Sequence, residues 1–225
     1  IKEWTNLFVV DKQAPEVLTV PEHARFAAGL ILKLREDGVL HESSRVLDLN
    51  SHALALIRAL RSAGSHDWDI ESMVMHQLLG SEGMRLVLEE DLQGRYNPIW
   101  HQGLPNSIGS VYRSREEFDA IVFSDGLQHS APPRDQIDAF SGEDKYKKMA
   151  NNQRLQIPVQ AWHALKKDGL FVQSVPWYAA TREEWQEYSS MQEFFGFQVL
   201  SNYSGVGHSI DNRTGDRFWQ RVLVC

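Results

Sequence analysis

The polar residues that follow one buried strand are the best candidates for chemistry in this sequence. An apolar run from Phe118 to Phe123 ends on Ser124 and Asp125, and His129 follows shortly after. A neutral imidazole near pH 7 is suited to take a proton from a reacting group. His129 is therefore the candidate general base, although a histidine here can equally cap the following helix or hydrogen-bond the loop.

A second candidate site lies in the turn at residues 50–53. The residues before it, Val46–Leu49, form a short apolar run, which predicts a buried strand. The residues after it, Leu54–Gly64, carry apolar side chains at helical spacing and end on a glycine, which predicts a helix. A strand, a tight turn and a helix form the first unit of a doubly wound sheet, and such sheets bind ligands at the carboxyl ends of their strands.

The rest of the chain predicts alternating strands and helices. Further strands are expected at Trp68–Met75, Tyr96–His101, within Glu117–Asp125 and ending on the acid, at Leu170–Val175, from Phe197 to Leu200 and at Phe218–Val224. Helices are expected at 21–38, 77–89, 135–151, 153–167 and 181–195, and a turn-rich connection at 205–215. Thr181 and Glu184 have the spacing of a capping box. The alternation predicts a mostly parallel sheet, and two strands close together at the end predict one antiparallel member.

The domain organisation follows from this order of elements. Residues 44–225 are expected to form one α/β domain, and residues 1–43 a helical cover over one sheet edge or a lid over the ligand crevice. The chain starts at Ile1, which suggests an excised domain or a processed product.

Composition excludes several classes of function. The 225 residues carry a formal net charge of −7 without a dense basic block, so nucleic acid is a poor default partner. No apolar run approaches the roughly 20 residues that cross a bilayer, so no membrane association is expected. The single cysteine, Cys225, fits a reducing compartment and a cytoplasmic location. The nine histidines are scattered without metal-ligand spacing, so no metal site is expected.

Four segments in order resemble class I S-adenosylmethionine-dependent methyltransferases. Residues 118–129, FDAIVFSDGLQH, are similar to F-D-x-I-x-x-x-D-V-L-E-H around the fourth strand of that family. Residues 165–176 resemble its L-K-P-G-G-x-L-V-x-S-x-P, residues 194–199 its A-G-F-x-V, and residues 45–49 the V-L-D-L of its first strand. The resemblance implies a Rossmann-like α/β fold, doubly wound, with a mostly parallel seven-stranded sheet and an antiparallel last strand.

The resemblance also implies which residues would bind S-adenosylmethionine. Asp48 corresponds to the family's acid in the first strand, which supports the following turn. Ser124 and Asp125 correspond to residues at the end of its fourth strand. By spacing, Glu71 takes the place of the acid that binds the ribose. If the second strand extends to Met75, that place falls to His76 instead.

The glycine-rich turn of the family is altered here. Its three glycines correspond to Asn50, His52 and Leu54, whose side chains would occupy space that the family leaves for the cofactor. His52 is then either a ligand contact or a plug that fills an unused pocket.

Two functions remain open. The first is methyl transfer from S-adenosylmethionine to an unidentified acceptor. The second is a catalytically inactive pseudo-methyltransferase, a pseudoenzyme that serves as a scaffold, a regulatory subunit or a binding module, with a protein partner.

Overall fold

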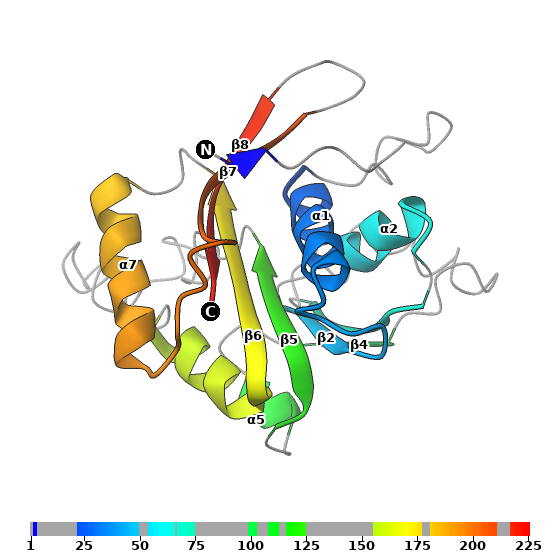
Figure 1. The fold of residues 1–225 in the computed structure, drawn as a ribbon. Helices are drawn as coiled ribbons and strands as arrows, with labels where there is room; N and C mark the ends of the chain where they lie inside the picture. Colours follow the sequence, from blue (N-terminus) through cyan, green and yellow to red (C-terminus); the bar gives the residue numbers. More distant parts are fainter. Residues whose placement is uncertain are drawn as a thin grey trace, which may run out of the picture.

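A central sheet with helices on both faces forms the body of the molecule (Figure 1). The structure, a computed structural model, describes residues 2–3, 22–49, 54–65, 67–74, 99–102, 108–112, 116–124, 155–176, 181–210 and 217–225. In these segments, no helix combines the length and the apolar character that a membrane crossing requires.

The sheet has eight strands in the order β1-β7-β8-β6-β5-β2-β3-β4. The strands are β1 (Lys2–Glu3), β2 (Arg45–Leu49), β3 (Asp69–Val74), β4 (Ile99–Gln102), β5 (Phe118–Ser124), β6 (Leu165–Pro176), β7 (Gly205–Ile210) and β8 (Arg217–Val224). Only β8 runs antiparallel to its neighbours; the other described pairs are parallel. The predicted mostly parallel sheet with an antiparallel last strand is therefore confirmed, and the two-residue β1 is a strand beyond the seven expected.

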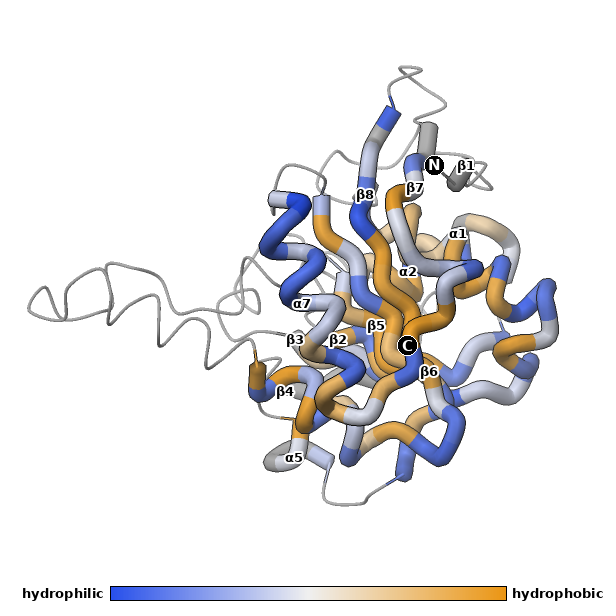
Figure 2. Tube along the Cα trace, turned by 60° about the vertical axis from the view of Figure 1, so that its left-hand side comes forward, coloured by the Kyte–Doolittle hydropathy of each residue, from blue (hydrophilic) through white to orange (hydrophobic). Residues whose placement is uncertain are grey.

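Two apolar layers enclose the sheet because successive side chains on a strand point to opposite faces. Val46 and Val122 face the helices α1 (Glu22–Glu36) and α2 (Ala55–Ser62). Leu47 and Ile121 face the opposite way, toward α5 (Ile108–Val111), the helical residues 155–164 and α7 (Arg182–Phe194). Figure 2 shows hydrophobic residues along the central strands and hydrophilic residues on the outer turns of α7. Burial on both faces explains why the central strands are continuously apolar.

The predicted helices 21–38 and 54–64 are confirmed as α1 and α2. In α1, Phe26, Leu30 and Leu34 recur at helical spacing and are fully buried. Gly38 follows with a φ of 73°, which ends the helix in the left-handed conformation that glycine favours.

The strand on the outer side of β8 differs from its prediction. Phe197–Leu200 does not form a strand, and the predicted turn region instead contains β7, whose residues pair with β8 from Gly205 to Ile210. Phe197 packs its ring against Trp162 and Phe171. Local turn propensity is here overridden by pairing with a distant strand.

The start of β6 also differs from its prediction. The preceding helix ends at residue 164, and β6 begins at Leu165 rather than after a helix stop at residues 167–169. Those residues form a bulge, since the pairing register shifts between Phe118 and Ala120 of β5. Gly169 is required there, because a Cβ atom would lie 2.9 Å from the Lys166 carbonyl oxygen.

Two other helix predictions, at 77–89 and 135–151, lie outside the described residues. The predicted helix at 181–195 is confirmed as α7, and Trp185 and Tyr188 are buried as expected. Phe194, the last residue of α7, is 87% exposed.

The capping box of α7 gives the first testable prediction. The Thr181 hydroxyl accepts a hydrogen bond from the Glu184 amide at 3.1 Å, and the Glu184 carboxylate accepts one from the Thr181 amide at 2.8 Å. Thr181→Ala should lower the free energy of unfolding by about 1 kcal/mol, measured by chemical denaturation. Thr181→Ser keeps the oxygen and is the control. Equal stability of the two variants would contradict the role of this cap.

Candidate functional site

The predicted site lies where β2 and β5 end side by side. These strands are adjacent and parallel, with Val46 opposite Ala120 and Asp48 opposite Val122. Their last residues, Leu49 and Ser124, therefore lie at the same carboxyl edge of the sheet. The two loops that were predicted to carry function begin from neighbouring positions.

Four of the predicted site residues follow those two strands in the sequence. Asn50, His52, Asp125 and His129 are outside the described residues, so their roles stay predictions. Asp48, Leu54, Glu71 and Ser124 belong to described elements, and the structure places each of them.

A row of buried polar side chains crosses four parallel strands near this edge. Asp48 and Ser124 lie on the same face as Val122, toward α1 and α2, and both are at least 92% buried at 3% and 8% exposure. Ser72 of β3 lies opposite Asp48, and Ser174 of β6 lies opposite Ser124. These hydroxyl groups and the carboxylate are suited to hydrogen-bond the hydroxyl and amino groups of a ligand.

The row continues into β8 with a buried amide. Gln220 pairs with Pro176 at the carboxyl end of β6 and is 0% exposed. Within the described residues, the side-chain oxygen and nitrogen of Gln220 and the Ser174 hydroxyl have no hydrogen-bond partner. A buried polar atom without a partner costs about 1–3 kcal/mol, so such atoms need an explanation such as a bound molecule.

Sequence reasoning missed Ser72, Ser174 and Gln220. Ser72 and Ser174 lie two positions before the ends of β3 and β6, and Gln220 lies in the half of the antiparallel β8 that pairs with the carboxyl end of β6. The polarity of Ser72 and Ser174 near two strand ends was a signal in the sequence, since a buried strand otherwise carries apolar side chains on both faces. The place of Gln220 follows only from the pairing of β8 with β6.

Leu54 occupies the third glycine position but does not fill the predicted ligand space. Its side chain is 0% exposed and packs in the core beneath α1. The expectation that this side chain would occupy the cofactor site is therefore wrong. Its backbone has a φ of 55°, in the left-handed region that glycine adopts easily and that costs leucine about 1–2 kcal/mol. The turn thus keeps a glycine-type backbone at this position, although the residue is leucine.

Glu71 lies inside β3, the second strand of the predicted sheet, and not at its end. The strand β3 continues to Val74, so the prediction that Glu71 lies at its end is wrong, and the following position falls outside the described residues. Glu71 is buried and forms an ion pair with Arg45, whose guanidinium also bonds Glu117 at 2.8 Å.

This ion-pair network lies toward the amino-terminal half of the sheet. The Arg45 guanidinium lies 5.0 Å from the centre of the Phe118 ring. Burial, and then the charge of Glu71, raise the pKa of Tyr112 far above its usual value. The network is suited to hold β2, β3 and β5 together. In the described part of the chain, no group of three His, Cys, Asp or Glu side chains is placed to hold a metal ion.

Solved structures with a similar fold are methyltransferases. Aeropyrum pernix fibrillarin, crystallised with natively bound S-adenosyl-L-methionine, superposes with a TM-score of 0.53 at 14% identity, covering 97% of this chain and 86% of that one. A Galdieria sulphuraria protein assigned as a sarcosine dimethylglycine methyltransferase gives 0.54 at 13% identity, covering 89% and 84%. A Pyrococcus horikoshii protein assigned as an RNA methyltransferase gives 0.53 at 13% identity, covering 96% and 91%.

The chain therefore has the Rossmann-like fold of class I S-adenosylmethionine-dependent methyltransferases. No protein-family model and no curated protein sequence matches it. At these low identities, the similarity of structure establishes the fold and leaves the activity to be argued from the site.

The backbone at Leu54 gives the second testable prediction. Leu54→Ala and Leu54→Gly both remove a buried side chain and should each lower the free energy of unfolding by about 2–5 kcal/mol. Because of the left-handed φ, we expect Leu54→Gly to be the more stable of the two by about 1 kcal/mol.

The matched control is Leu60, which is equally buried but lies inside α2. There, Leu60→Ala should be more stable than Leu60→Gly by about 0.5–1 kcal/mol. Denaturant titrations of the four variants test this. The same order at both positions would show that residue 54 lacks the glycine-type backbone.

Proposed function

We propose that this protein binds S-adenosylmethionine at the carboxyl edge of β2 and β5 and transfers its methyl group to an acceptor that is not identified. The observation that carries the proposal is the row formed by Asp48, Ser72, Ser124 and Ser174, buried at that edge in a sheet of methyltransferase topology. The structurally similar fibrillarin of Aeropyrum pernix was crystallised with the same cofactor.

The residues of the row fit such a ligand chemically. A nucleoside and an amino acid together present several hydroxyl, amino and carboxylate groups, which need donors and acceptors in a largely buried setting. Asp48 supplies a carboxylate acceptor, and Ser124 supplies a hydroxyl that donates and accepts. The partnerless Ser174 hydroxyl and Gln220 amide fit a polar ligand better than a dry core.

The reaction requires alignment more than it requires acid–base chemistry. When bound, S-adenosylmethionine supplies a methyl group on a positively charged sulfur. The protein must hold the acceptor atom in line with that methyl group, and strand ends that are fixed by the sheet are suited to this positioning. Where the acceptor must lose a proton, His129 is the candidate base, since it follows directly after β5 in the chain.

The altered turn favours a second candidate function. Asn50 and His52 stand where the resemblance implies glycine, and both have side chains that would compete with a ligand for space. A pseudo-methyltransferase that uses the fold as a scaffold or binding module would tolerate these residues. The left-handed backbone at Leu54 supports the enzyme instead, because it keeps at this position a conformation that glycine adopts easily, and the resemblance implies glycine there.

Calorimetric titration provides the third testable prediction. S-adenosylmethionine and S-adenosylhomocysteine should each bind the native chain with a Kd in the micromolar range. Ser124→Ala should weaken binding by roughly 2-fold to 12-fold, the effect of one hydrogen bond. Ser190→Ala, on the exposed side of α7, is the control and should bind like the native chain. If no heat of binding is measured at millimolar ligand, the proposal of an enzyme is wrong and the scaffold function is favoured.

Replacement of the altered turn residues gives the fourth prediction. If the native protein binds the cofactor, its site already accommodates the side chains of Asn50 and His52. The double variant Asn50→Gly/His52→Gly should then change the Kd for S-adenosylmethionine by less than about tenfold. The scaffold function predicts that binding appears only in the double variant. The same titration distinguishes the two results.

A further inference from the structure

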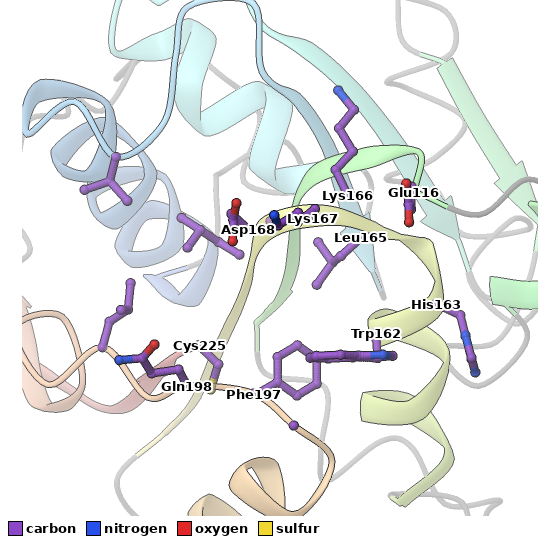
Figure 3. Close-up of a pocket in the computed structure, with 15 residues that line it drawn as sticks. Glu116, Trp162, His163, Leu165, Lys166, Lys167, Asp168, Phe197, Gln198 and Cys225 are labelled. Atoms are coloured by element: carbon purple, nitrogen blue, oxygen red, sulfur yellow. The ribbon is translucent and has the colours of Figure 1, made fainter.

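A pocket lies at the opposite edge of the sheet from the candidate cofactor site (Figure 3). It has a volume of about 780 Å³ and lies at the amino-terminal ends of β5 and β6. Its lining comes from the segment after α1, the segment before β5, the start of β6, the end of the helix 155–164, the connection after α7, and the residue after β8. Because β5 and β6 begin here and end at the other edge, this pocket is separate from the site proposed above.

One side of the pocket is aromatic. Trp162 is 48% exposed, and its ring meets Phe197 edge-on, with 5.1 Å between the ring centroids. Gly196 lies under the indole, where a Cβ atom would come within 3.2 Å of the ring. Figure 3 shows Trp162 and Phe197 along one side of the pocket, with Leu165 and Asp168 along the other. The indole is thus held in place by neighbours while half of it stays accessible.

Exposed apolar residues gather around this pocket. The described chain has four large apolar side chains that are clearly exposed, and two of them, Val39 and Trp162, line the pocket. Val159 lies one helical turn before Trp162, and Phe194 lies two residues before the lining residue Gly196. An exposed apolar patch of this kind is typical of a surface that binds another molecule.

The lining of the pocket carries two carboxylates, Glu116 and Asp168, and two lysines, Lys166 and Lys167. Glu116 and Asp168 are both exposed, and neither carboxylate forms an ion pair within the described residues. Lys166 bonds Asp119 at 2.8 Å, and its ammonium group points away from the pocket (Figure 3). Lys167 is then the remaining lysine of the lining.

The two acidic residues of the rim also have an unusual backbone. Glu116 has a φ of 59° and Asp168 a φ of 63°, and both residues line this one pocket. Left-handed backbone costs a non-glycine residue about 1–2 kcal/mol and is concentrated at functional sites. The Glu116 amide donates a hydrogen bond to the His163 carbonyl at 3.3 Å, which fixes one of these residues against the helix that carries Trp162.

We propose that this pocket binds a basic segment of a partner protein through an arginine or lysine side chain. The apolar stem of that side chain would pack on Trp162, whose ring is supported by the buried Phe197, and its cationic group would be attracted by the indole and by the carboxylates of Glu116 and Asp168. The net charge of −7 on the chain favours the approach of such a segment.

A peptide array tests this proposal. Synthetic peptides with a central arginine or lysine, flanked by leucine, phenylalanine, proline or glycine, are probed with the native chain. Each arginine peptide is repeated with citrulline, which keeps the shape and removes the charge. We expect binding to arginine peptides that is lost with citrulline and that weakens at high salt. An array without any citrulline-sensitive peptide overturns the proposal.

Variants then locate the bound peptide. Trp162→Ala should weaken the best peptide by roughly 3-fold to 30-fold, and Glu116→Gln or Asp168→Asn by roughly 2-fold to 5-fold. Asn tolerates the left-handed backbone at residue 168, so this change removes only the charge. Glu187→Gln, an exposed acid on α7 outside the pocket, is the matched control and should bind normally. Equal binding by Trp162→Ala and the native chain overturns the proposal.

Two additional measurements separate the alternatives. If L-arginine amide binds as tightly as the best peptide, the pocket recognises a free small cation and the partner-protein proposal fails.

The calorimetric titration with S-adenosylmethionine should be unchanged in Trp162→Ala. Failure of cofactor binding in the native chain would therefore leave the peptide result intact, and failure of the peptide would leave the cofactor result intact.

Discussion

The parallel pairing of β2 with β5 is the constraint on which the rest of the structure depends. Both strands are buried on both faces, so their backbone hydrogen bonds must be made with each other and with β3 and β6. The register also decides which side chains face α1. A shift by one residue would turn Asp48 to the other face and bring Leu47 in its place. The polar row and the two apolar layers are therefore set by the same pairing.

Most of the fold could be predicted from local patterns. The strands β2 and β5 are short apolar runs, and α1, α2 and α7 show helical spacing with glycine or capping residues at their ends. The errors lie where pairing is non-local. β7 contains Gly205 and Gly207, which favour a turn, but its partner β8 holds it as a strand. The bulge before Gly169 depends on the approach of the β5 backbone, which no local pattern reveals.

The candidate site was predictable in position but not in composition. The carboxyl ends of β2 and β5 followed from the order of elements, and this located Asp48 and Ser124. Ser72, Ser174 and Gln220 were missed, because a single polar residue in a strand does not reveal which face it occupies until the register is known. Spacing likewise could not show that the backbone at Leu54 turns its side chain into the core.

The length of the central strands has a consequence for how the two edges of the sheet can be used. β5 has seven residues, which at about 3.3 Å per residue places its two ends roughly 20 Å apart. Two molecules of ordinary size can therefore occupy both edges at once without touching. A domain of this shape can be tethered at its base while its opposite rim remains open to solution.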